Sequence, residues 1–168
     1  MTAPAWSLSL AYWLHMLSTV AWIGGLAAVV LLVLPTAQKS LDPSGYAAFL
    51  DSLHRRLDPI AWLSLAVLVG TGLFQMSASP NYEGFIAINN LWAAAILAKH
   101  LVFLAMTGVS AYLTWGVLPA LRRIAMLKAR GRDAAGLEGL QNPETLLLRL
   151  NFVLGIVVLG LTAIARAA

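Results

Sequence analysis

The sequence contains no cysteine and very little charge. Of its 168 residues only 11% are Asp, Glu, Lys or Arg, whereas 60% are hydrophobic. The lack of cysteine excludes disulfides, thiolate metal sites and cysteine nucleophiles. The sparse charge, together with a mean hydropathy of +0.81, lies outside the usual range for a soluble globular domain. These scarcities favour a membrane protein.

What the sequence has instead is a series of long uncharged stretches. A bilayer core of about 30 Å requires roughly 20 residues of helix. The stretches predict four spans, at about residues 8–34, 59–78, 90–118 and 143–166. We therefore expect an all-α fold, an integral membrane four-helix bundle that forms a single domain over residues 1–168.

Acidic residues followed by proline indicate where two helices begin. Asp58-Pro59 is typical of an N-cap and first helical residue, and predicts the start of the second span. Asp42-Pro43 predicts a short cytoplasmic helix over residues 44–57, ahead of the second span.

Asparagine gives similar signals for the other two helices. Asn142-Pro143 predicts the start of the fourth span, because proline is well tolerated at the first helical position. Asn90 is placed to cap the third span. The second, third and fourth spans thus each have a predicted local boundary in addition to an apolar run.

Basic residues fall almost entirely on one side of the predicted bundle. The first and third loops and their flanks carry nine: Lys39, Arg55, Arg56, Arg122, Arg123, Lys128, Arg130, Arg132 and Arg149. The C-terminal end carries only Arg166, and the N-terminus and second loop carry none. The positive-inside rule then places the basic loops in the cytoplasm and both termini outside. We expect these charges to contact anionic lipid, and no nucleic acid.

Lys99 and His100 lie inside the third span, where ionisable residues are costly and usually face a partner, a cavity or a cofactor. At 1.5 Å per helical residue, His100 lies roughly 15 Å deep, and His15 of the first span roughly 10 Å deep. Two imidazoles at similar depth on different helices can ligate one haem iron from opposite faces. His54 lies on the cytoplasmic side and is not expected to join them.

The neighbours of the two histidines suit a flat macrocycle. The expected cofactor-binding neighbours are small or aromatic: Ser18, Thr19, Trp22 and Gly25 beside His15, and Phe103 and Thr107 beside His100. Lys99 points about 100° around the helix from His100. Lys99 is therefore expected to balance a haem propionate or to transfer protons, and Arg166 is a second propionate partner. Ordinary interhelical hydrogen bonds for the histidines, and plain helix packing for the glycines, stay open as alternatives.

Copper is the competing metal. Cu(II) accepts imidazole, whereas Cu(I) prefers thiolate or thioether. Met16 adjoins His15, but adjacent helix residues point about 100° apart. The sequence has no Met-x-x-Met or His-x-His cluster. The residues therefore favour haem b over a copper ion as the cofactor.

Three short motifs resemble a known family. The segment His15-Met-Leu-Ser-Thr-Val-Ala-Trp22-Ile-Gly24-Gly25 resembles the opening motif of the membrane domain of copper-resistance protein D. Ala98-Lys99-His100 resembles that family's alanine-lysine element, and Arg149-Leu-Asn151-Phe-Val-Leu-Gly155 is similar to its final helix. The same histidine, tryptophan–glycine pattern and intramembrane lysine also resemble the HemJ-type protoporphyrinogen oxidases, which bind haem b. The resemblance implies a bacterial inner-membrane protein that acts either in copper uptake or resistance or as a haem-dependent oxidase.

From the residues we predict a membrane-embedded b-type cytochrome for electron transfer, with His15 and His100 as the metal ligands. Its partner would be a quinone or a redox protein, and a homo-oligomer or a larger membrane complex is compatible with the lipid-facing helices. Three alternatives stay open: copper transport, porphyrinogen oxidation with Lys99 transferring protons, and a purely structural subunit. As an enzyme the protein would be a haem-dependent membrane oxidoreductase.

Overall fold

The apolar stretches form four long helices in the computed structural model, which describes residues 4–86, 88–129 and 137–168. The first helix is built from three α-helical parts joined by two π-helical turns: α1 (Ala5–Thr19), Val20–Gly24, α2 (Gly25–Ala28), Val29–Val33 and α3 (Leu34–Ser40). The others are α4 (Pro43–Ser77), then α5 (Leu91–Tyr112) with the π-helical turn Leu113–Val117 and α6 (Leu118–Ala129), and finally α7 (Leu137–Ala167). The described residues contain no strand.

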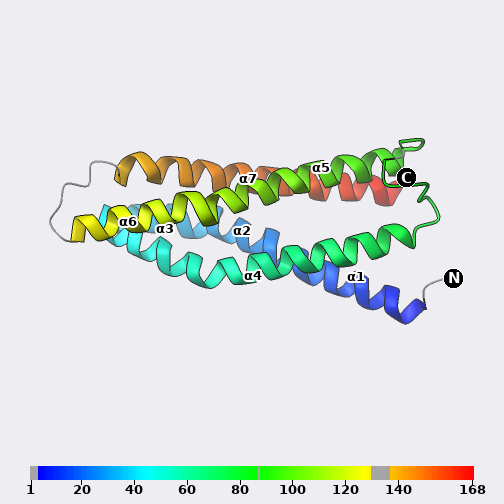
Figure 1. Cartoon of the computed structure of the whole chain (residues 1–168), viewed down its shortest axis with the longest axis horizontal. Helices are drawn as coiled ribbons and strands as arrows, with labels where there is room; N and C mark the ends of the chain where they lie inside the picture. The colour runs from blue at the N-terminus through cyan, green and yellow to red at the C-terminus, as the bar shows by residue number, and fades with distance from the viewer. Residues whose placement is uncertain (1–3, 87, 130–136) are drawn as a thin grey trace.

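All four helices are long and apolar enough to cross a membrane, which confirms the predicted all-α membrane bundle. Figure 1 shows them lying lengthwise beside one another. Both chain termini and the α4–α5 connection lie at one end, called the terminal end below. The α3–α4 turn and α6 lie at the other, called the basic end. Large apolar side chains such as Trp13, Leu32 and Leu63 are exposed on the outside, where they contact lipid.

Two predicted helix caps are confirmed. The Asp42 carboxylate accepts a hydrogen bond from the Gly45 backbone N–H at 3.3 Å, at the start of α4. The Asn90 side chain accepts one from the Ala93 backbone N–H at 2.7 Å, at the start of α5. Each bond satisfies a backbone donor that has no partner within the first helical turn.

The two predicted starts at proline are wrong. Pro59 lies inside α4, so residues 44–57 and the second span form one continuous helix rather than a separate short helix and a span. Pro143 likewise lies inside α7, which begins at Leu137. Proline removes one intrahelical hydrogen bond, but surrounding helices in a membrane bundle compensate for such a break. The Asp58 carboxylate does not cap the helix; it contacts the His54 ring instead.

Packing between the helices forms two groups of buried apolar side chains. One fills the basic end and includes Leu34, Leu50 and Leu121. The other lies near the middle and includes Trp22 and Met106. The middle group is tightly packed where α7 approaches it. A Cβ atom added at Gly155 would lie 3.4 Å from both Ile23 Cγ2 and Met106 Cε.

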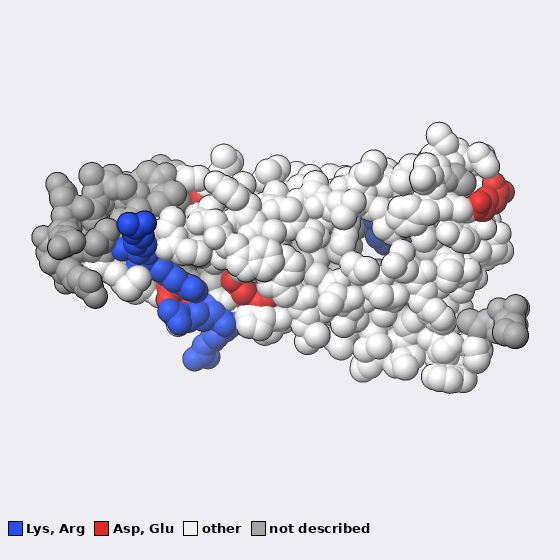
Figure 2. Space-filling view, in the orientation of Figure 1, with Lys and Arg blue, Asp and Glu red and all other residues white. Residues whose placement is uncertain are grey.

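The described lysines and arginines gather at the basic end, as Figure 2 shows. Among the nine basic residues of the first and third loops, Arg130 and Arg132 and the side chain of Lys128 lie outside the described residues. Arg122 pairs with Asp51, which is also bonded to Arg55. Figure 2 also shows a recessed basic group at the bottom of a hollow in the terminal half, and an acidic patch at the extreme terminal end.

Candidate functional site

His15 is held in place by a hydrogen bond between two helices. Its Nδ1 lies 2.8 Å from the Thr71 hydroxyl oxygen on α4. The Thr71 hydroxyl donates its proton to the Val67 carbonyl oxygen at 2.6 Å, so toward His15 it can only accept. His15 is therefore the tautomer with a proton on Nδ1 and a lone pair on Nε2.

His100 has the same protonation for a simpler reason. Its Nδ1 lies 2.7 Å from the Ile96 carbonyl oxygen, one turn earlier in α5. A carbonyl only accepts, so Nδ1 carries a proton, and in the neutral ring the lone pair is on Nε2. The Phe85 ring packs edge-on against the imidazole, with ring centroids 5.4 Å apart.

The two imidazoles thus share a chemical state that suits metal binding. Both have Nδ1–H engaged by an oxygen that fixes the ring, so in the neutral form each directs a lone pair from Nε2. Within the described part of the chain, neither Nε2 has a hydrogen-bond partner. A histidine that ligates a metal through one ring nitrogen usually donates the N–H of the other to an oxygen, as Nδ1 does here.

Lys99 lies close to the His15 side of the bundle. Its positive charge disfavours a positive charge on His15 of α1, and it is itself repelled by the charge of Arg166 on α7. The Arg166 guanidinium also lies over the Tyr12 ring, 4.8 Å from the ring centroid. Two cationic side chains therefore accompany His15 at the terminal end, one on each of two neighbouring helices.

The other predicted site residues divide into two sets. Trp22 and Phe103 contact each other edge-to-face, with centroids 5.6 Å apart. Thr19 and Thr107 donate their hydroxyl protons to the carbonyls of His15 and Phe103, within their own helices. Ser18 is buried within α1.

Gly25 belongs to the second set, and Trp22 contributes to this set as well. Both line a pocket toward the basic end, beside His54 rather than beside His15. Gly25 has nothing within 4 Å of an added Cβ atom, so no side chain packs closely on it. The structure therefore places Gly25 with a different group of residues from the one predicted.

That group contains a cluster that the sequence interpretation missed. His54 Nδ1 lies 3.1 Å from Asp58 Oδ1, and His54 Nε2 lies 3.2 Å from Glu144 Oε1 on α7. Glu144, which directly follows Pro143, is fully buried. The usable signal was His54 four residues before Asp58, which puts both on one helix face. The prediction that His54 does not join the other histidines agrees with these contacts.

Copper ligands are sparse around the two site histidines. Among the residues that the structure describes, no group of three or more His, Cys, Asp or Glu is arranged to hold a metal ion. Met16 is 63% exposed on the lipid-facing side, whereas Met106 is fully buried in the middle apolar group. Among the described contacts, neither of these two methionines is placed to add a thioether to His15 or His100.

The comparisons with known proteins give one match. The family model described as copper resistance protein D matches residues 51–165. No curated protein and no solved structure matches the chain. The similarity to the HemJ-type oxidases thus has no counterpart in these comparisons.

Proposed function

We propose that this chain, which belongs to the copper resistance protein D family, is a membrane protein that binds b-type haem for electron transfer. The observation that carries the proposal is the matched state of His15 and His100. Both have Nδ1–H held by an oxygen and Nε2 without a partner among the described residues. Haem b would supply one-electron redox chemistry, with the two histidines as its axial ligands.

The charges near His15 support a tetrapyrrole with carboxylates over a bare metal ion. Lys99 and Arg166 place two positive charges in a part of the bundle where the described residues offer no carboxylate partner to either of them. Haem propionates would supply the missing negative charge. Lys99 is half-buried and Arg166 is exposed, and charged side chains within a membrane are usually paired.

A copper ion at the same two histidines is the second candidate, because the family description names copper resistance. Imidazole is a suitable ligand for Cu(II). The sparse ligand set described above is the argument against it. Copper and haem would use the same Nε2 atoms, so the two candidates differ in the metal and not in the site.

The orientation that we propose follows the distribution of charge. With the basic end in the cytoplasm, the positive-inside rule is satisfied and both termini face outward. His15 and His100 then lie nearer the outer surface of the inner membrane. A quinone or an outward-facing redox protein would be the electron-transfer partner at that end.

A visible spectrum combined with metal analysis tests the proposal. Protein purified after expression with ample haem should contain iron and show the sharp reduced α-band of a six-coordinate b-type haem. His15→Ala and His100→Ala should each remove that band. His54→Asn, a change at the third histidine, should keep it, and unfolding curves would establish that all three variants are folded.

The outcomes separate the candidates. A colourless protein with stoichiometric copper that depends on His15 and His100 would replace haem by copper at the same site. A folded protein that binds neither metal would reject both. Retention of the haem spectrum in His15→Ala and His100→Ala would reject the ligand assignment.

A further inference from the structure

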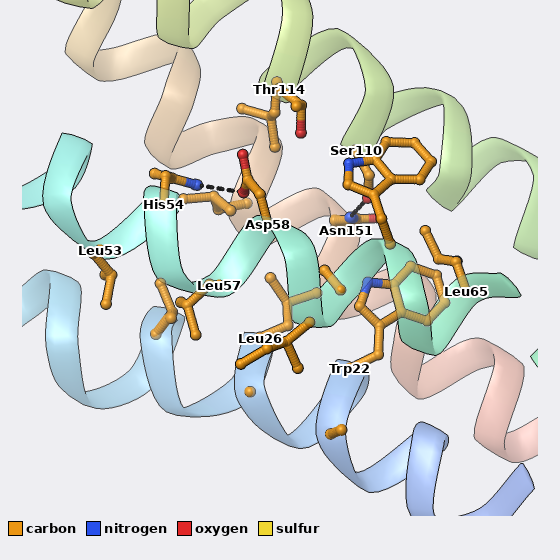
Figure 3. Close-up of a pocket in the computed structure, with 18 residues that line it drawn as sticks. Trp22, Leu26, Leu53, His54, Leu57, Asp58, Leu65, Ser110, Thr114 and Asn151 are labelled. Carbon is orange, nitrogen blue, oxygen red and sulfur yellow. Dashed lines mark hydrogen bonds and ion pairs between the residues drawn. The ribbon is translucent and has the colours of Figure 1, made fainter. Parts of the chain in front are cut away.

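A pocket of about 90 Å³ lies between the helices toward the basic end, away from His15 and His100 (Figure 3). Its wall is mostly apolar. The hydroxyl, amide and ionisable residues that line it come from α4, from the helix that contains α5 and α6, and from α7: His54, Asp58, Ser110, Thr114 and Asn151. A cavity that holds benzene measures about 150 Å³. The pocket therefore suits a small polar group better than an aromatic ring.

The helices depart from regular α-helical geometry where they border this pocket. Each of the three π-helical turns in the described part of the chain supplies part of the pocket wall. A π-helical turn interrupts the regular packing of a helix and is frequent at functional sites. The wall residues from these turns are Ala21, Trp22, Val29, Leu113 and Thr114. Three such turns around one pocket indicate a binding site rather than a packing defect.

The polar side of the pocket has hydrogen-bond acceptors without partners. Asp58 contacts the His54 ring through Oδ1 only, so its Oδ2 is unpaired within the described residues. Asn151 donates its amide N–H to the Ser110 hydroxyl at 2.9 Å, and its Oδ1 has no partner there either. Thr114 lies opposite Asp58 in Figure 3, and its hydroxyl makes no hydrogen bond with the described chain. Unpaired polar groups cost free energy, so we expect an occupant that donates hydrogen bonds.

The charges beside the pocket favour a cation as this donor. Both ring nitrogens of His54 contact carboxylates, one of Asp58 and one of Glu144. An imidazolium between two carboxylates still leaves a net charge of −1. The paired arginines of this end do not compensate it, because they are bonded to Asp51 instead. An ammonium group combines a positive charge with N–H bonds that only donate.

Two indoles complete the surroundings of such a group. Trp22 and Trp62 both line the pocket. Trp22 packs edge-on against Phe103, and Trp62 stacks on Trp115 with ring centroids 4.8 Å apart, so neighbouring rings fix both indoles. A desolvated ammonium ion is attracted to the face of an indole ring. The aromatic lining therefore favours a cation over a neutral donor such as water.

The pocket borders lipid near the exposed arginines of α4. Ile60 lines the pocket and is 51% exposed on the outside of the helix. Arg56 lies four residues earlier on the same face, and it is exposed as well. Along the helix axis Arg56 is about 3 Å from Asp58. A phosphate attached to an ammonium group in the pocket would thus have a cation close by, at the edge of the membrane.

We propose that this pocket binds the head group of a phospholipid that ends in a primary ammonium. The ammonium N–H groups donate to Asp58, Asn151 and Thr114. The lipid phosphate pairs with Arg56. A head group that also carries a carboxylate is repelled by Asp58, and a trimethylated ammonium has no N–H to donate. The preferred lipid is therefore phosphatidylethanolamine. The site does not depend on the metal centre proposed above.

Native mass spectrometry of the full chain tests the lipid preference. The protein is exchanged into vesicles with equal parts of phosphatidylethanolamine and phosphatidylcholine that have identical acyl chains. The wild-type protein should retain the ethanolamine lipid about tenfold more, because choline cannot form the charge-assisted hydrogen bonds. Asp58→Asn should remove this preference, whereas Glu83→Gln, at an exposed carboxyl, should keep it. Arg56→Ala should weaken the retention of both lipids equally, because both carry the phosphate.

A change that fills the pocket gives a second test and leaves its polar groups intact. Gly25 lines the pocket, and an added Cβ has nothing within 4 Å. Gly25→Leu should therefore fold, occupy the space and lower retention of the ethanolamine lipid by about tenfold. Gly70→Leu is the matched control, because its added Cβ is equally free and lies outside the pocket wall. Unfolding curves would establish that all variants are folded.

The outcomes separate the site, its position and its ligand. Equal retention of the two lipids by folded wild-type protein would overturn the ammonium site. A preference that survives in folded Asp58→Asn and Gly25→Leu would overturn its position in this pocket. Free ethanolamine is the competitor that distinguishes the sources. If it displaces the lipid at an equal concentration, the ammonium site is supported and the lipid as its source is overturned.

Discussion

Histidine is half-buried at the terminal end of the bundle and buried at the basic end, and the two ends complete its hydrogen bonding differently. At the terminal end, His15 and His100 each use Nδ1 and keep Nε2 without a partner from the described residues. At the basic end, both ring nitrogens of His54 contact carboxylates. The first arrangement leaves a ligand atom for something from outside the chain, whereas the second uses both ring nitrogens within the chain.

The partners of the rings explain the difference. A hydroxyl and a backbone carbonyl are neutral, so they orient an imidazole without charging it. Two carboxylates favour an imidazolium, which cannot ligate a metal. The comparison therefore suggests that residue type alone does not identify a metal ligand in a membrane, since the same side chain has opposite roles at the two ends. Four changes test this comparison.

The largest effect is expected for Glu144→Ala at the basic end. Removing the Glu144 carboxylate leaves the buried His54 Nε2 without its partner, while Asp58 still contacts Nδ1, and we expect a cost of about 3 kcal/mol for a buried group that loses a charged partner. Glu144 is fully buried and contacts His54, so we expect a loss of this size in the free energy of unfolding. Denaturant titration in mixed micelles measures it. Glu83→Ala, at an exposed site, should change stability by less than about 0.5 kcal/mol. Equal effects at the two sites would contradict the contrast between them.

The next effect is expected at the middle of the bundle, which both ends share. Gly155→Leu should destabilise the protein by about 2 kcal/mol, because overpacking forces neighbours to move. A Cβ atom there already lies 3.4 Å from Ile23 and Met106. Gly160→Leu is the matched control, since an added Cβ has nothing within 4 Å. Thermal unfolding of the two variants should differ clearly; similar curves would indicate that the middle is loosely packed.

A smaller effect is expected at the terminal end, from Thr71→Val. This change removes the acceptor for His15 Nδ1–H and should reduce the affinity for the proposed metal centre by about tenfold. Without metal it should lower the free energy of unfolding by about 1 kcal/mol, the value of one hydrogen bond. Thr162→Val is the control, because that hydroxyl bonds only the Val158 carbonyl of its own helix. An affinity unchanged by Thr71→Val would indicate that His15 is not a ligand.

Much of the fold could be predicted because bilayer thickness fixes the length of a span. The apolar runs therefore identified all four helices. Asp42 and Asn90 were correctly predicted as caps, because a cap needs only the backbone that follows it. Pro59 and Pro143 were misleading for the opposite reason. Whether a helix continues through proline depends on the helices packed around it, and no local pattern contains that information.

The two ends also differed in how far the sequence could identify their polar groups. His15 and His100 stood out because polar residues are rare in lipid. Their free Nε2 atoms could not be predicted, since that state depends on Thr71 of a different helix and on the rotamer of His100. The contact between His54 and Glu144 was missed because it joins residues 90 positions apart. Each residue alone is typical of a helix flank.

The smallest effect is expected for Arg55→Ala, at the surface of the basic end. Arg55 bonds Asp51 at 2.9 Å, but its side chain is 65% exposed. Exposed ion pairs contribute about 0–1 kcal/mol and are screened by salt, so we expect a loss below about 0.5 kcal/mol. Arg56→Ala is the control, an exposed neighbour for which the structure gives no ion pair. Unfolding measured at low and high salt should give nearly the same value for both. A salt-dependent loss approaching that of Glu144→Ala would mean that the Arg55–Asp51–Arg122 group and the buried contacts of His54 with Asp58 and Glu144 act as one network.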